Sequence, residues 1–87
     1  MTYIWDPAAQ LERNQIADYI YGRFGERHAM KFLDDVDEAV DMIVRHPGIG
    51  TIDPLFADRS VTYRSIVVDG LSKMVYCVED DVIYIAA

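Results

Sequence analysis

Residues 61–78, VTYRSIVVDGLSKMVYCV, contain two β-strand patterns on either side of Asp69-Gly70. An Asp-Gly pair between two runs rich in β-branched and aromatic residues is the strongest short signal for a hairpin turn. The first run predicts a strand over residues 61–68, and the second predicts a strand over residues 71–78. The two strands are expected to pair antiparallel, since a tight turn joins them.

Two further strands are expected nearer the ends of the chain. Residues 82–86 follow a polar segment, Glu79-Asp80-Asp81, that predicts a second chain reversal. Residues 2–5, TYIW, form a short run of strand-forming residues at the N-terminus. The C-terminal part is therefore expected to be three consecutive antiparallel strands, with one more strand contributed by the beginning of the chain.

Two helices are expected between these strands. Asp6-Pro7 is typical of a helix start, with an N-cap aspartate and a proline at the first helical position, and this helix is expected over residues 7–23. A second helix is expected over residues 26–46, where Pro47-Gly48 ends it. The short break between them predicts an antiparallel helical hairpin. The residues expected to be buried are Ile16, Ile20, Phe32, Leu33, Val36 and Val40.

The order of these elements predicts an α+β fold: an N-terminal strand, an antiparallel helical hairpin and then three antiparallel strands. A chain of 87 residues is the size of one domain, so residues 1–87 are expected to form a single domain. Residues 47–60 fit neither helix nor strand and are expected to form a loop. A loop of this length in a small domain is often functional.

Charge and composition exclude several classes of protein. Fifteen acidic and eight basic residues give a net charge of −7, which on average repels the phosphate backbone of nucleic acids. Cys77 is the only cysteine, so no intramolecular disulfide is possible and a reducing compartment fits best. No apolar run approaches the roughly 20 residues that a membrane span needs. We expect a soluble, cytoplasmic protein that binds no metal and no other cofactor.

Arg64 is unusual for its position. In the predicted strand 61–68 it shares a face with the apolar residues Ile66 and Val68. One interpretation is structural: the strand lies at the margin of the sheet, and the guanidinium reaches water or pairs with an acid such as Asp58. The other is functional: a cation held on a rigid sheet faces a phosphate or carboxylate, which a guanidinium binds with a planar pair of donors.

Two more cations are candidates for the same patch. Lys73 lies on the neighbouring predicted strand, and Arg59 lies in the preceding loop. Tyr63 should face the other side of the sheet and is expected to be a core residue. The acidic residues of the second helix between Asp34 and Asp41 fall opposite its apolar stripe, which is typical of a solvated outer surface.

Three segments of the sequence together resemble the RelE/ParE superfamily of toxins from type II toxin–antitoxin modules. They are IWDPAAQLERNQIADYI (4–20), HAMKFLDDVDEAVDMIVRHPGIG (28–50), and YRSIVVDG with MVYCVEDDVIYIAA (63–70 and 74–87). The resemblance implies a co-encoded antitoxin that wraps around the toxin, and growth arrest when the antitoxin is degraded. RelE-like members cut mRNA on the ribosome without a metal, whereas ParE-like members poison DNA gyrase and are not nucleases.

The resemblance also implies roles for individual residues. Arg64 matches the strand arginine that in RelE-like members stabilises the phosphate at the cleavage point, so Arg64 and Lys73 are the candidate catalytic residues and Arg59 a candidate substrate-binding residue. Lys73 and Cys77 stand where the family commonly has arginine. The family usually continues with a basic C-terminal tail, and we expect this chain to lack one, because the sequence ends at Ala87. Without that tail a RelE-like site lacks a proton donor or acceptor, because arginine does not readily exchange a proton.

Two functions are therefore expected. The chain is either a growth-inhibiting toxin, and an enzyme only if it is an mRNA interferase, or a non-toxic binding module that pairs with an antitoxin-like partner. The high apolar content and an open sheet edge after the last strand predict a homodimer or a complex with an antitoxin.

Overall fold

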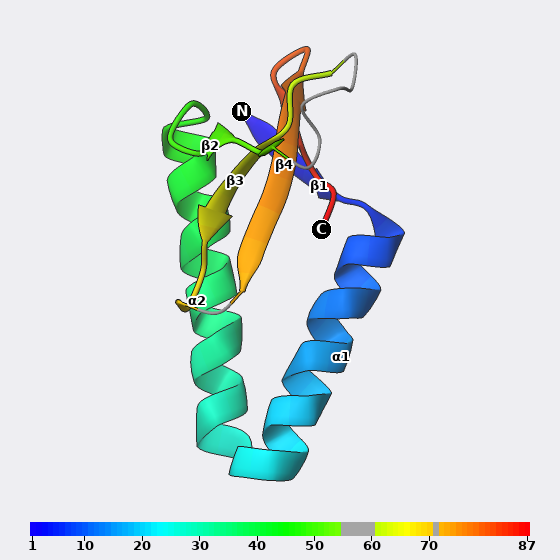
Figure 1. Cartoon of the computed structure of the whole chain (residues 1–87), viewed down its shortest axis with the longest axis vertical. Coiled ribbons are helices and arrows are strands. Elements are labelled where there is room, and N and C mark those ends of the chain that lie inside the picture. Colours follow the sequence, from blue (N-terminus) through cyan, green and yellow to red (C-terminus); the bar gives the residue numbers. More distant parts are fainter. Residues whose placement is uncertain (55–60, 71) are drawn as a thin grey trace.

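The computed structural model describes residues 1–54, 61–70 and 72–87. It contains helices α1 (Pro7–Phe24) and α2 (Glu26–Arg45) and strands β1 (Thr2–Trp5), β2 (Thr51–Ile52), β3 (Arg64–Val67), β4 (Lys73–Glu79) and β5 (Val82–Ile85). This order confirms the predicted α+β fold, with an N-terminal strand, two helices and then antiparallel strands (Figure 1). Strand β2 lies within the segment 47–60 that was predicted to be a loop. The sequence did not predict this strand, because two residues are too few to produce an alternating pattern.

The described strands form one sheet in the order β1-β5-β4-β3-β2. The β5-β4, β4-β3 and β3-β2 pairs are antiparallel, whereas β1 runs parallel to β5. The last strand is therefore an inner strand, and the prediction that it leaves an open edge is wrong. Both helices and three strands lie between β1 and β5 in the chain, which is far more than the roughly dozen residues that a parallel crossover needs, so β1 can cover the edge of β5. In the described part of the chain, the outer strands are β1 and β2.

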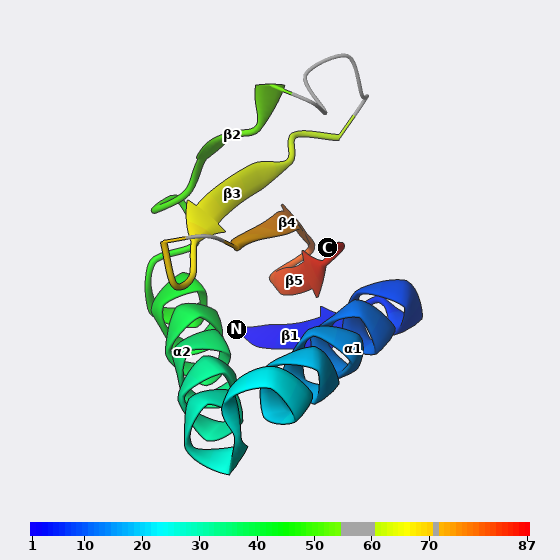
Figure 2. The ribbon, with the colours of Figure 1, turned by 60° about the horizontal axis from the view of Figure 1, so that its bottom comes forward.

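Helix α2 builds the core with the inner strands. Its buried side packs against β4 and β5, and the predictions that Phe32, Val36 and Val40 are buried are confirmed. Leu33 is only partly buried, at the margin of this core. The buried core residues are Phe32, Val36, Ala39, Val40, Ile43, Met74, Tyr76, Ile83 and Ile85. Figure 2 shows the strands gathered on one side of the two helices.

Helix α1 packs less closely on the sheet than α2 does. It begins as predicted, with the Asp6 carboxylate accepting a hydrogen bond from the Ala8 N–H (2.8 Å). The two helices meet at Gly25 and then diverge towards the sheet (Figures 1 and 2), so only part of α1 faces the core. Ile20 is partly buried against that core. The prediction that Ile16 is buried is wrong, because 37% of this residue is exposed.

Candidate functional site

A short turn, residues 47–50, follows α2 and is fixed to the sheet by Tyr76 of β4. The Tyr76 side chain is fully buried; its hydroxyl donates to the Pro47 carbonyl (2.7 Å) and accepts from the Gly50 N–H (3.0 Å). A Cβ atom at Gly50 would lie 2.9 Å from both Tyr76 Oη and the Ser65 carbonyl oxygen. Only glycine therefore allows the turn to approach the sheet this closely. No local sequence pattern predicts this contact, because Tyr76 looks like any other aromatic residue of a strand.

Arg64 holds the same turn from the neighbouring strand. It lies directly opposite Tyr76 in the β3-β4 register, is half-buried, and its Nη1 donates to the Gly50 carbonyl (2.8 Å). Both the N–H and the C=O of Gly50 are thus bonded to side chains of the sheet. Arg64, Tyr76 and the turn 47–50 are called the turn clamp below. Tyr76 belongs to the core that α2 covers, and Arg64 lies opposite Tyr76 in the register. Arg64 is therefore on the side of the sheet that packs against the helices.

Lys73 lies on the opposite face of the sheet from Arg64. Lys73 pairs with Val67 of β3, so the two side chains share a face of the sheet. Val67 is three positions from Arg64 on the same strand, and residues three positions apart point to opposite faces. The Lys73 Nζ lies 2.6 Å from Oδ2 of Asp53, whose side chain is fully buried, while 43% of the Lys73 side chain is exposed. The structure therefore does not bring Arg64 and Lys73 into one patch. Arg59 and Asp58 lie outside the described residues, so the predicted roles of these residues remain predictions.

Tyr63 is not buried in the core, although the sequence predicted that it would be. It faces away from the helices and lines an open hollow of about 380 Å³ together with Cys77 and Tyr84, so the prediction that it is a core residue is wrong. The alternation along the strand was inferred correctly, but the packed face is the one that carries Arg64. Burial, and to a lesser extent the charge of Glu79, raises the pKa of the Cys77 thiol above its ordinary value.

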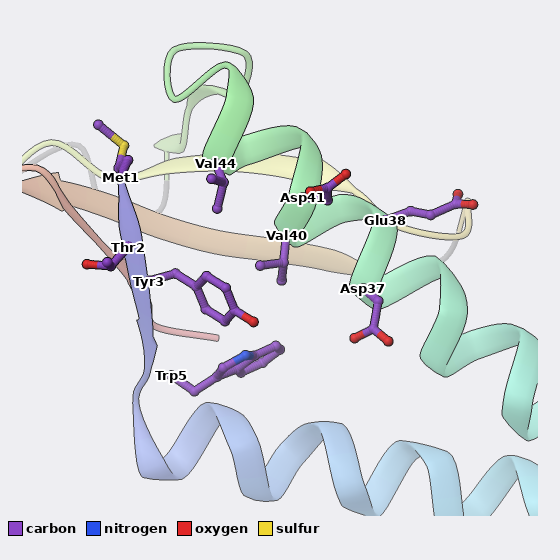
Figure 3. A pocket seen from close by; sticks show the side chains of 9 residues that line it. All are labelled: Met1, Thr2, Tyr3, Trp5, Asp37, Glu38, Val40, Asp41 and Val44. Atoms are coloured by element: carbon purple, nitrogen blue, oxygen red, sulfur yellow. The ribbon is translucent and has the colours of Figure 1, made fainter.

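A larger groove, of about 870 Å³, separates β1 from α2 (Figure 3). On the strand side, the rings of Tyr3 and Trp5 extend towards the helix. The lining residues are Met1, Thr2, Tyr3, Trp5, Asp37, Glu38, Val40, Asp41 and Val44. The three acidic residues are exposed, as the helix pattern predicted, but they also border this groove. The sequence did not reveal the groove, because β1 and α2 meet only in the folded chain. The space between β1 and α2 is called the acidic groove below.

The described residues, 1–54, 61–70 and 72–87, contain no group of three or more histidine, cysteine, aspartate or glutamate residues that could hold a metal ion. None of the helices in the described part of the chain is long and apolar enough to cross a membrane.

Comparison with known proteins identifies the family. A family model described as the ParE toxin of the type II toxin–antitoxin system, parDE, matches residues 3–87. No curated protein matches the chain. The match extends from β1 through both helices to the end of β5, and it agrees with the resemblance seen in the sequence. The chain therefore belongs to the ParE toxin family of type II toxin–antitoxin systems.

Proposed function

We propose that this chain is a cytoplasmic, growth-inhibiting toxin that a cognate antitoxin neutralises, and that its target is DNA gyrase. The family match supports a toxin, and the turn clamp is the observation that favours gyrase over mRNA. An RNA-cleaving site needs a cation aimed at the phosphate and groups that exchange protons with the reacting oxygens. Here Arg64 bonds to the Gly50 carbonyl, and the hydroxyl opposite it, on Tyr76, is buried and bonded on both sides.

A toxin that acts by binding another protein needs a rigid surface instead of catalytic groups. The turn clamp provides rigidity, because side chains from two strands hold the backbone of Gly50. The clamped turn presents Ile49, which is 45% exposed, to solvent. In this proposal Arg64 is a positioning residue: it holds the turn in place and does not touch the target's reacting atoms.

The alternatives to a gyrase-directed toxin are an mRNA interferase and a non-toxic binding module. An mRNA interferase is favoured by the match of Arg64 to the strand arginine of RelE-like toxins. A non-toxic module that only binds an antitoxin-like partner is favoured by the net charge of −7, which opposes binding to ribosomes or DNA. Each alternative has its own outcome in the experiment below.

The test is expression of the chain in a bacterium without its antitoxin. We expect growth arrest, gyrase-dependent DNA breaks in the arrested cells, and inhibition of supercoiling by the purified chain. Cleavage of mRNA that precedes the arrest, mapped by primer extension, would replace gyrase with mRNA as the target. Normal growth in cells that contain the folded chain would favour the non-toxic module.

Substitution of Arg64 separates positioning from catalysis. Arg64→Ala removes a charge-assisted hydrogen bond from a half-buried site, which should lower the free energy of unfolding by about 1–2 kcal/mol. Toxicity should then follow the folded fraction and return when cells are grown at lower temperature. Loss of a catalytic contact would reduce activity on the order of a hundredfold even in the fully folded variant. Arg27→Ala, which removes the same charge from an exposed position on α2, is the control and should leave toxicity unchanged.

A further inference from the structure

Strand β1 presents an edge that is suited to pairing with another chain. It has β5 on one side and no strand of the described sheet on the other. Its sequence, TYIW over residues 2–5, contains neither the charged residues nor the proline that usually block such an edge. The opposite edge differs, because β2 has only two residues and offers few backbone groups to a partner, whereas β1 has four. A partner that extends the sheet would therefore add to β1.

The acidic groove beside this edge indicates the charge of the partner. Asp37, Glu38 and Asp41 border it from α2, and none of the lining side chains is basic. Asp41 also pairs with Arg45 at 3.2 Å, but both side chains of this pair are about two-thirds exposed, so the pair is weak. Lysine or arginine side chains of a partner would complement these carboxylates. A second copy of this chain is a poor occupant, since each copy carries a net charge of −7.

The remaining lining of the acidic groove also suits basic side chains. Tyr3 and Trp5 present aromatic rings between β1 and α2 (Figure 3), and Val40 lies on the helix side. Lysine and arginine pack their aliphatic stems on apolar surface and place their charge over aromatic faces. The same chain already shows this contact, with the Arg13 guanidinium 4.8 Å from the centre of the Trp5 ring.

We infer that the acidic groove binds an extended, basic segment of the antitoxin, which adds a strand to the free edge of β1. Successive side chains of a strand point to opposite faces of the sheet, so every second residue of the segment would face α2. Basic residues at those positions would reach the three carboxylates, and apolar residues between them would lie on the outer face near Ile4. This inference rests on the proposed function, because it takes the antitoxin as the natural partner.

The binding test uses the fluorescence of Trp5, which is the only tryptophan of the chain and lines the groove. The probe is a capped heptapeptide of alternating lysine and valine, and its comparison is a heptapeptide of alternating glutamate and valine. We expect saturable changes in emission with the lysine peptide and none with the glutamate peptide. The lysine peptide with every backbone nitrogen methylated should also fail to bind, because it lacks the backbone donors that extend a sheet.

Variants test the contribution of the carboxylates. The triple variant Asp37→Asn, Glu38→Gln, Asp41→Asn should bind the lysine peptide at least about tenfold more weakly. The control removes three acidic charges at exposed positions outside the groove: Glu12→Gln, Asp18→Asn and Glu26→Gln. It should bind within about twofold of the wild-type chain, because distant exposed charges are screened by salt.

The outcomes decide the inference independently of toxicity. Equal binding of the lysine peptide by the triple variant and the wild-type chain would overturn the assignment of the carboxylates, and equal binding of the glutamate peptide would overturn the charge of the partner. Binding of the N-methylated peptide would overturn strand addition. A Trp5 emission change that depends only on the concentration of this chain would assign the groove to a second copy. Failure of the toxin proposal appears separately, as normal growth on expression without antitoxin.

Discussion

The Tyr76→Phe substitution measures how strongly the turn clamp is held. The change removes one oxygen atom and leaves the ring, so it creates almost no cavity. It deletes the hydrogen bonds to the Pro47 carbonyl (2.7 Å) and the Gly50 N–H (3.0 Å), at a side chain that is fully buried. The turn 47–50 is expected to loosen as a result.

The expected cost follows from these two bonds. Each contributes about 0.5–1.5 kcal/mol net, and leaving a buried partner without its bond moves the cost towards the upper end. We therefore expect a loss of about 2–3 kcal/mol in the free energy of unfolding. For a domain of this size each kcal/mol shifts Tm by about 4–8 °C, so the variant should melt roughly 10–20 °C below the wild-type chain.

The assay is urea and thermal unfolding followed by circular dichroism, together with amide hydrogen exchange at Gly50. Tyr84→Phe is the matched control, since it removes the same atom from a residue on β5 that is 38% exposed, and it should change stability by less than about 0.5 kcal/mol. If Tyr76→Phe were as stable as Tyr84→Phe, and Gly50 exchanged no faster than in the wild-type chain, the hydroxyl would not hold the turn.

Two further predictions concern the outer face of the sheet. Lys73→Met removes the ion pair with the fully buried carboxylate of Asp53 and should lower the free energy of unfolding in urea by about 1–2 kcal/mol, a value reduced because the lysine is partly exposed. Lys31→Met, which breaks the exposed pair with Asp35, is the control and should have no measurable effect on stability. Equal effects of the two substitutions would contradict this reasoning. The raised pKa of Cys77 means that the folded chain holds the thiol proton more tightly than the unfolded chain, so stability should be constant below the ordinary thiol pKa and should fall as the pH rises through the folded pKa. Cys77→Ala should abolish this decline of stability at high pH. Alkylation of Cys77 near pH 8 should be much slower in the folded chain than in urea. Equal alkylation rates in the two states would show that burial does not protect the thiol.

Local patterns in the sequence determined which elements form and in what order. The spacing of Phe32, Val36 and Val40 by fours predicted the buried side of α2, because a helix brings such residues to one face. Asp6-Pro7 predicted the start of α1, and Asp69-Gly70 predicted the β3-β4 pairing. These signals are readable because each acts over a few neighbouring residues. The pattern of α1 was weaker, and the burial of Ile16 was predicted wrongly.

The tertiary structure alone decided how distant segments meet. The pairing of β1 with β5, the bond from Arg64 to Gly50, the ion pair of Lys73 with Asp53, and the acidic groove all join residues far apart in the chain. Alternation along a strand assigns residues to two faces, but it does not say which face the helices cover. For that reason the sequence correctly placed Arg64 and Tyr63 on opposite faces, whereas only the packing of α2 on β4 and β5 decided that Arg64 lies on the covered face.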